Sequence, residues 1–138
     1  MNDNPIQKKT ILIVDDKSDN IAVLAAILKE NYRLKVASNG KRALELMSTE
    51  SKPDLVLLDI IMPEMDGYEV CKQLKSNPLT KDIPIIFTTA LGDPKDEEKG
   101  LQLGAEDFIG KPYSPAIISK RIATHIELKH YRDLVNLK

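Results

Sequence analysis

Short apolar segments alternate with amphipathic segments from about residue 10 to the end of the chain. Residues 11–14 (ILIV) and 55–58 (LVLL) are almost free of polar alternation, which is typical of strands buried on both faces of a parallel sheet. The strand that contains 11–14 is expected to start at Thr10, and the strand that contains 55–58 is expected to end at Asp59. The remaining strand-like segments are 32–37, 85–88 and 107–110. Each is followed by residues with helical apolar spacing, so the sequence predicts five successive βα units.

Each predicted helix begins near a residue that favours helix N-termini. The candidates are, in chain order, Asp16, Ser18 or Asp19, then Asn39, Asp66, Asp93 before Pro94, and Ser114 before Pro115. The fourth helix is expected to stop near Gly104. Right-handed crossovers then predict an α/β fold with a doubly wound five-stranded parallel sheet, flavodoxin-like in its strand order 2-1-3-4-5, and helices on both faces.

The length and charge of the chain exclude several classes of protein. Its 138 residues suffice for one domain, and 20 Lys plus Arg against 21 Asp plus Glu give a net charge of -1 without a basic block. Direct nucleic-acid binding is therefore not expected. One cysteine, no apolar signal core and no stretch of about 20 apolar residues predict a cytoplasmic protein that does not enter the membrane. We expect Cys71 to lie on a helix as a packing residue, and we expect the side chains of His125 and His130 to be exposed.

Three carboxylates follow the two most apolar strands. Asp15 and Asp16 come directly after residues 11–14, and Asp59 comes directly after residues 55–58. Because the first and third strands are neighbours in the predicted order, these acids should converge on one crevice at the carboxyl edge of the sheet. Like charges held close together favour a cation, and Mg²⁺ prefers oxygen ligands and often binds a phosphate as well. An aspartate can itself act as the nucleophile towards phosphorus.

The other two inner strand ends carry groups that would stabilise a phosphoryl group. Thr89 follows 85–88, and Lys111 follows 107–110. Together these motifs make the chain resemble a receiver domain of the bacterial two-component response regulator family. The matching residues extend from about Lys9 to Ile126 and include Asp15-Asp16, Asp59 with the segment 62–67 (MPEMDG), Thr89-Ala90 and 108–112 (FIGKP).

The resemblance implies roles for individual residues. Asp59 would be the phosphoacceptor, and Mg²⁺ would be held by Asp16, by Asp15 mainly through water, by Asp59 and by the backbone carbonyl of Ile61. Thr89 would donate a hydrogen bond to the phosphoryl group and Lys111 would pair with it, with a cis bond before Pro112. The phosphoryl donor would be a sensor histidine kinase or a phosphotransfer protein.

The resemblance also implies a conformational switch. Phe108 matches an aromatic residue that turns inward as the hydroxyl of Thr89 moves to the phosphoryl group. Ile61 and Leu91 lie two residues after Asp59 and Thr89, and neither side chain can orient a hydrolytic water. We therefore expect slow self-dephosphorylation.

Three other functions remain to be distinguished from a receiver that controls an output domain. A stand-alone phosphorelay carrier would share the same chemistry. A small Mg²⁺-dependent phosphatase with an aspartyl nucleophile would need a general acid, commonly two residues after the nucleophile, where this chain has Ile61. A flavin- or dinucleotide-binding protein shares the fold class, but it would need a Gly-rich or hydroxyl-rich first loop, and the loop 15–20 (DDKSDN) has no glycine.

The last helix carries two apolar stripes. Ile118, Ile122 and Ile126 suit packing on the sheet, whereas Thr124, Leu128, Tyr131 and Val135 form a second, heptad-like series. We therefore expect a flexible tail at 1–9, a receiver domain at 10–126, and at 127–138 a helical extension towards an output domain beyond these residues. A homodimer through the last strand and its flanking helices, or through the C-terminal helix, is also considered.

Overall fold

The computed structural model describes residues 8–90 and 94–136. In these residues five parallel strands form one sheet in the order β2-β1-β3-β4-β5. The strands are β1 (Thr10–Val14), β2 (Arg33–Ala37), β3 (Leu55–Asp59), β4 (Ile85–Thr89) and β5 (Asp107–Gly110). The predicted fold class and strand order are confirmed.

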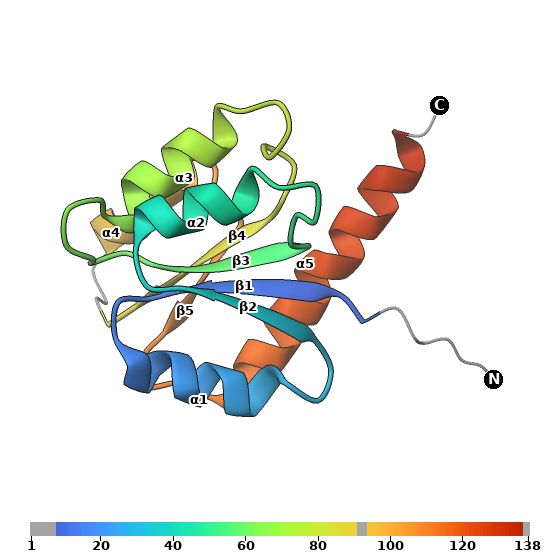
Figure 1. The fold of residues 1–138 in the computed structure, drawn as a ribbon. Helices are drawn as coiled ribbons and strands as arrows, with labels where there is room; N and C mark the ends of the chain where they lie inside the picture. The colour runs from blue at the N-terminus through green and yellow to red at the C-terminus, as the bar shows by residue number, and fades with distance from the viewer. Residues whose placement is uncertain (1–7, 91–93, 137–138) are drawn as a thin grey trace.

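Five helices connect and follow the strands: α1 (Ser18–Leu28), α2 (Gly40–Met47), α3 (Gly67–Lys75), α4 (Pro94–Gln102) and α5 (Pro115–Val135). Helices α2 and α3 cover one face of the sheet, while α1 and α5 cover the other (Figure 1). Because side chains alternate along a strand, Leu12 and Leu58 pack towards α2 and α3, whereas Ile13 and Leu57 pack towards α1 and α5. Burial of both strand faces explains why 11–14 and 55–58 are continuously apolar.

Most helices begin where the sequence predicts. The side chains of Asn39, Asp66 and Ser114 accept hydrogen bonds from the backbone N–H groups three residues later, at the starts of α2, α3 and α5. The prediction for α1 was wrong, because its N-cap is Lys17 and no side chain caps it. Asp15 Oδ1 instead accepts from the backbone N–H of Lys17 at 2.9 Å. Asp93 lies outside the described residues.

Small differences appear at other element ends. β2 begins at Arg33 rather than residue 32, because the Tyr32 N–H donates to the Leu28 carbonyl in the turn after α1. β4 extends by one residue to Thr89, which pairs with Gly110 of β5. α4 ends at Gln102, just before Gly104 adopts a φ of 105°. This left-handed turn is one that glycine accommodates without steric cost.

Helix α5 confirms the inner of the two predicted stripes. Ile118 and Ile122 are fully buried against the sheet, and Ile126 packs on the same cluster. His130 is exposed as expected, but His125 is not, since its side chain is only 15% exposed and its Nε2 lies 3.0 Å from Asp107 Oδ2. The prediction for His125 was wrong because it did not anticipate that β5 would present a carboxylate to this helix.

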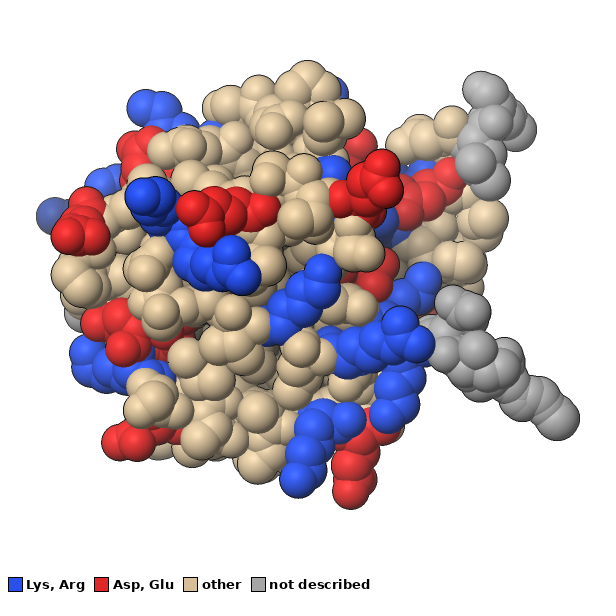
Figure 2. Space-filling view, viewed as in Figure 1, with Lys and Arg blue, Asp and Glu red and all other residues tan. Residues whose placement is uncertain are grey.

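Charged groups of both signs are interspersed on the face shown in Figure 2, as the near-neutral net charge leads one to expect. None of the helices in the described part of the chain is long and apolar enough to cross a membrane.

Candidate functional site

Strand register brings the predicted site residues to one edge of the sheet. Val14 of β1 pairs with Leu58 of β3, so Asp15 and Asp59, one residue further along each strand, become neighbours. Asp59 pairs with Thr88 of β4, and Thr89 pairs with Gly110, which Lys111 follows. All carboxyl ends of parallel strands lie at the same edge, and ligands bind there in folds of this type. The site predicted from the sequence is therefore assembled by the sheet itself.

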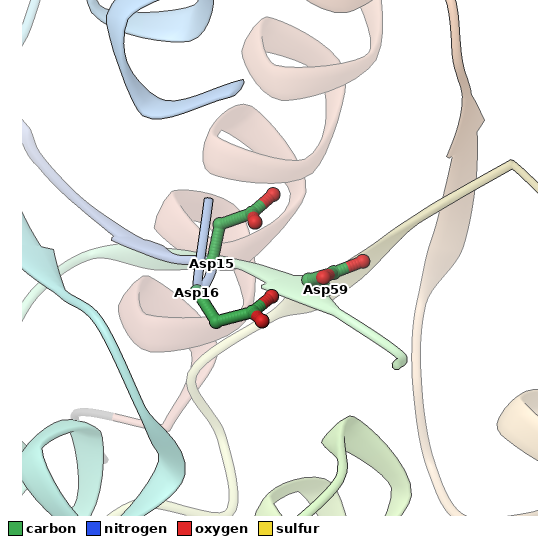
Figure 3. A group of neighbouring side chains, drawn as sticks. All are labelled: Asp15, Asp16 and Asp59. Atoms are coloured by element: carbon green, nitrogen blue, oxygen red, sulfur yellow. The ribbon is translucent and has the colours of Figure 1, made fainter. Parts of the chain in front are cut away.

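The carboxylates of Asp15, Asp16 and Asp59 extend towards the same side, beyond the ends of β1 and β3 (Figure 3). One oxygen from each lies within 4.8 Å of the others. Asp15 is 1% exposed and Asp59 is 4% exposed. Among the described residues, Asp15 Oδ2 and Asp16 Oδ1 are buried without a hydrogen-bond partner. Buried anionic oxygens left in this way are costly, and a cation would satisfy them.

Lys111 supplies the nearest positive charge. Its Nζ lies 3.0 Å from Asp59 Oδ1, as a hydrogen bond, and 3.8 Å from Asp15 Oδ2. Burial raises the pKa of Asp59. The hydrogen bond from Lys111 lowers this pKa, whereas the negative charge of Asp15 raises it further. The Lys111–Pro112 peptide bond is cis, as predicted.

A pocket of about 180 Å³ opens above Asp59. Its lining residues come from every loop at this edge except that after β2, and they are Lys17, Asp59, Ile60, Ile61, Thr89, Ala90 and Lys111. Ile61 is 62% exposed, so an apolar residue stands beside the nucleophile candidate where solvent enters. Leu91, its predicted counterpart, lies outside the described residues.

Gly67 holds the loop after β3 close to Asp59. Its N–H donates to the Ile60 carbonyl at 2.7 Å, and a Cβ at this position would lie 2.2 Å from the Asp59 carbonyl oxygen. Any larger residue would push α3 away from β3. Gly67 therefore fixes the path of Ile60 and Ile61, whose positions define one wall of the pocket.

The predicted switch residues lie on the other side of the pocket. Thr89 is 5% exposed at the end of β4, and Phe108 is 8% exposed, with its ring turned inward. The centroids of the Phe108 and Phe87 rings are 5.6 Å apart. A Cβ on Gly100 of α4 would lie 2.6 Å from Phe108 Cζ and 2.9 Å from Phe87 Cδ2. Gly100 therefore forms a notch in α4 that receives both rings.

Sequence reasoning missed a further contact of this aromatic group. The Tyr68 ring packs against Phe87 at a centroid distance of 5.5 Å, its hydroxyl donates to the Asp96 carbonyl at 3.2 Å, and Lys99 Nζ lies 4.4 Å from the ring centre. These contacts join α3 to α4. Tyr68 follows the 62–67 segment directly, but its spacing does not reveal which neighbouring helix it meets.

Comparison with known proteins identifies the family. The model of the response regulator receiver domain matches residues 11–123. A Vibrio cholerae protein named "Probable cyclic di-GMP phosphodiesterase" is 49% identical over 126 residues, which are 91% of this chain and 28% of that protein. Response regulator PleD of Caulobacter vibrioides is 40% identical over 120 residues, which are 86% of this chain and 26% of PleD. The chain thus spans about a quarter of the length of these two relatives.

Solved structures give the same result. The receiver domain of a sensor histidine kinase from Pseudomonas aeruginosa, which has a magnesium ion coordinated in its active site cleft, is 28% identical with a TM-score of 0.80, covering 88% of this chain and 99% of that one. The receiver domain of a histidine kinase from Syntrophus aciditrophicus is 38% identical with a TM-score of 0.79, covering 86% and 90%. With its sheet order, its acidic edge and these matches, the chain belongs to the response regulator receiver domain family.

Proposed function

We propose that Asp59 of this receiver domain accepts a phosphoryl group from a sensor histidine kinase or a phosphotransfer protein, in a reaction that requires Mg²⁺. Receiver domains are phosphoacceptor modules of signal transduction, and they pair with such donors. The observation that carries the assignment to Asp59 is its place between Asp15, Asp16 and Lys111 at the floor of the pocket. Phosphoryl transfer to a carboxylate needs positive charge around the phosphoryl oxygens. Asp15 and Asp16 would contribute by holding Mg²⁺, and Lys111 would contribute its own charge.

The residues at this edge suit Mg²⁺ in number and kind. Receiver domains bind this ion at an acidic pocket, and here three carboxylates converge, two of which have a buried oxygen without a hydrogen-bond partner among the described residues. Asp15, Asp16 and Asp59 would hold the ion together with the backbone carbonyl of Ile61. When bound, Mg²⁺ supplies positive charge that offsets the carboxylates and the phosphoryl oxygens.

The chain's own side chains account for the transfer. An Asp59 carboxylate oxygen forms a bond to phosphorus as the P–N bond to the donor histidine breaks, and the imidazole keeps the electron pair and takes up a proton. Lys111, already 3.0 Å from Asp59 Oδ1, would pair with a phosphoryl oxygen. The Thr89 hydroxyl would donate to another, because both residues line the pocket.

We further propose that the chain is a regulatory module and not a phosphatase. A phosphatase of the aspartyl-nucleophile class would need a general acid near Asp59, and the residue that stands there is Ile61, exposed and apolar. Self-catalysed gain and loss of the phosphoryl group would then be its only chemistry. Movement of Thr89 and Phe108 would transmit the state of Asp59 to an output domain, or to a partner if the chain acts as a phosphorelay carrier.

Intact mass spectrometry after incubation with acetyl phosphate tests the proposal. We expect one phosphoryl adduct that requires Mg²⁺ and is lost in Asp59→Asn. Asp82→Asn, which changes an exposed carboxylate outside the site, serves as the matched control and should still be phosphorylated. Multiple-turnover hydrolysis of a phosphomonoester would instead favour the phosphatase.

A further inference from the structure

The loop between β5 and α5 carries a tyrosine whose hydroxyl group is buried. The ring of Tyr113 is half-buried and packs on the apolar cluster between the sheet and helices α1 and α5. Its hydroxyl oxygen forms no hydrogen bond of normal geometry with any residue that the structure describes. A buried phenol usually has a hydrogen-bond partner, because a buried hydroxyl without one costs free energy. Ring packing alone does not explain this hydroxyl, since a phenylalanine would pack equally well.

Strand alternation places the acidic site on the same face of the sheet as this tyrosine. Asp15, Asp59 and Thr88 each lie two residues after a side chain of that apolar cluster, and the Asp15 N–H continues the strand ladder by donating to the Ala37 carbonyl at 3.1 Å. Burial raises the pKa of Tyr113 to about 12. Thr88 opposes this rise, whereas the negative charges of Asp15 and Asp59 add to it. Tyr113 therefore lies within electrostatic reach of both carboxylates and remains a hydrogen-bond donor at neutral pH.

Asp15 offers the acceptor that matches this donor. One of its oxygens, Oδ1, is held by a backbone N–H at 2.9 Å. The other, Oδ2, is buried, lies 3.8 Å from Lys111 Nζ, and has no hydrogen-bond partner among the described residues. Asp59, in contrast, already accepts a hydrogen bond from Lys111. Because a carboxylate oxygen has two lone pairs, Asp15 Oδ2 can accept from a hydroxyl and still face a cation.

We propose that Tyr113 is a positioning residue of the metal site. Its hydroxyl donates a hydrogen bond to Asp15 Oδ2, directly or through one water, and holds this carboxylate in the orientation that serves Mg²⁺. The inference rests on the proposed function, because that function requires the ion. Hydrogen-bond partners behind metal-binding side chains fix the orientation of those side chains, and loss of one lowers metal affinity by about 10- to 100-fold. Lys111 and Tyr113, on either side of the cis Pro112, would then serve one site from a single loop.

Calorimetric titration with MgCl₂ tests the role of the hydroxyl. Tyr113→Phe removes the hydroxyl and keeps the ring, and Tyr131→Phe makes the same change at an exposed tyrosine of α5 as the matched control. We expect the Mg²⁺ dissociation constant to rise by about tenfold in Tyr113→Phe and to stay unchanged in Tyr131→Phe. Equal affinities of wild type and Tyr113→Phe would overturn the inference and leave the proposed function intact. A wild-type protein that binds no Mg²⁺ would overturn both.

Thermal unfolding separates positioning of the metal site from packing of the fold. Without Mg²⁺, Tyr113→Phe should be at least as stable as wild type, because it removes a buried hydroxyl that has no hydrogen-bond partner among the described residues. With Mg²⁺, its melting temperature should rise less than that of wild type. A variant that is destabilised without the ion, and that gains as much as wild type when the ion is added, would show that the hydroxyl serves the fold through Thr88. That result would overturn the proposal.

The side-chain carboxyl carbon of Asp15, followed by NMR in the Mg²⁺-saturated protein, reports directly on the proposed hydrogen bond. Its resonance should shift in Tyr113→Phe relative to wild type, whereas the resonance of the exposed Asp82 should not. An Asp15 resonance that does not move would exclude action through Asp15 and overturn the proposal. Phosphorylation of Asp59 does not enter any of these measurements, so a failure of phosphoryl transfer would be seen separately.

Discussion

At the scale of single residues, the candidate site contains more negative charge than its own cations balance. Lys111 contacts Asp59 and lies near Asp15, whereas Lys17 is largely exposed and 3.8 Å from Asp16 Oδ2. Two buried carboxylate oxygens have no hydrogen-bond partner among the described residues. Such an arrangement costs stability in the folded state, and binding of a cation recovers it.

Mg²⁺ should therefore stabilise the folded protein. At a concentration ten times its dissociation constant, the ion should raise the free energy of unfolding by about 1.4 kcal/mol. Thermal unfolding with and without MgCl₂ measures this effect. The double variant Asp15→Asn, Asp16→Asn should lose the Mg²⁺ response, while Asp82→Asn should keep it. A wild-type protein whose melting temperature does not respond to Mg²⁺ would contradict the proposed metal site.

Self-dephosphorylation should be slow because Ile61 and Leu91, which come two residues after Asp59 and Thr89 in the sequence, are both apolar. Ile61 is exposed at the pocket and has no group to orient a water molecule. Ile61→Asn combined with Leu91→Glu should increase the hydrolysis rate of the phosphorylated protein by up to about 100-fold, the lower end of the range that a positioned acid–base group supplies. Loss of the phosphoryl adduct over time, followed by intact mass, gives the rate. An unchanged rate would show that these positions do not limit hydrolysis.

Cys71 should make the protein sensitive to alkaline pH. Burial raises the pKa of its thiol from 9.0 to about 11 in the folded state. The folded form therefore holds this proton more tightly than the unfolded form, and the resulting stability is present below pH 9 and lost as the pH rises through 9 to 11. The loss should be on the order of 2 kcal/mol at pH 11. Urea unfolding between pH 8 and 11 should show a steeper decline for wild type than for Cys71→Ala; parallel curves would refute this.

At the scale of elements, α4 and β5 meet through ring packing that leaves no room for a Cβ on Gly100. Gly100 accommodates the rings of Phe87 and Phe108, and Tyr68 ties α3 to the same helix through Asp96 and Lys99. A displacement of Phe108 must therefore move α4 or be accommodated by another rotamer. The contact gives the proposed switch a route from the site to the surface of α4.

The notch at Gly100 can be tested by filling it. Gly100→Ala should destabilise the fold by up to roughly 2 kcal/mol, because overpacking costs about 1–3 kcal/mol and is offset by a gain of about 1 kcal/mol in helix propensity. Gly110→Ala is the matched control, since a Cβ there meets no atom within 4 Å. Chemical denaturation of both variants decides the matter. A Gly100→Ala protein as stable as wild type would mean that the rings of Phe87 and Phe108 can shift at little cost in free energy.

The elements were largely predictable because strand burial and helix capping leave local signals. The apolar runs 11–14 and 55–58 indicated both the strands and their central places in the sheet, and Asn39, Asp66 and Ser114 marked three helix starts. Contacts set by tertiary packing left no such signal. The Tyr68–Phe87 packing and the His125–Asp107 pair depend on how α3 and α5 lie against their neighbours, which residue spacing does not fix. The uncapped start of α1 was missed because Asp15 and Asp16 serve the acidic cluster instead.

At the scale of the whole molecule, the acidic site and the projecting C-terminal end of α5 lie at opposite ends of the sheet. The site occupies the carboxyl edge, where α5 also begins after Lys111 and the cis Pro112. Helix α5 then runs along the sheet and past its other edge (Figure 1). A phosphoryl group on Asp59 would act on β5 through Lys111, and Arg121 connects β5 to α5 through the Phe108 carbonyl. Site and helix are therefore mechanically connected in one domain.

The proposed function of the domain depends most directly on which residue carries the phosphoryl group. Borohydride reduces an acyl phosphate of aspartate to homoserine, so reduction after acetyl phosphate treatment, followed by peptide mapping, locates the modified residue. We predict homoserine at position 59 only, formed only in the presence of Mg²⁺, with Asp15, Asp16 and Asp54 unchanged. Homoserine at another position, or an adduct that survives in Asp59→Asn, would contradict the assignment of Asp59 as the phosphoacceptor.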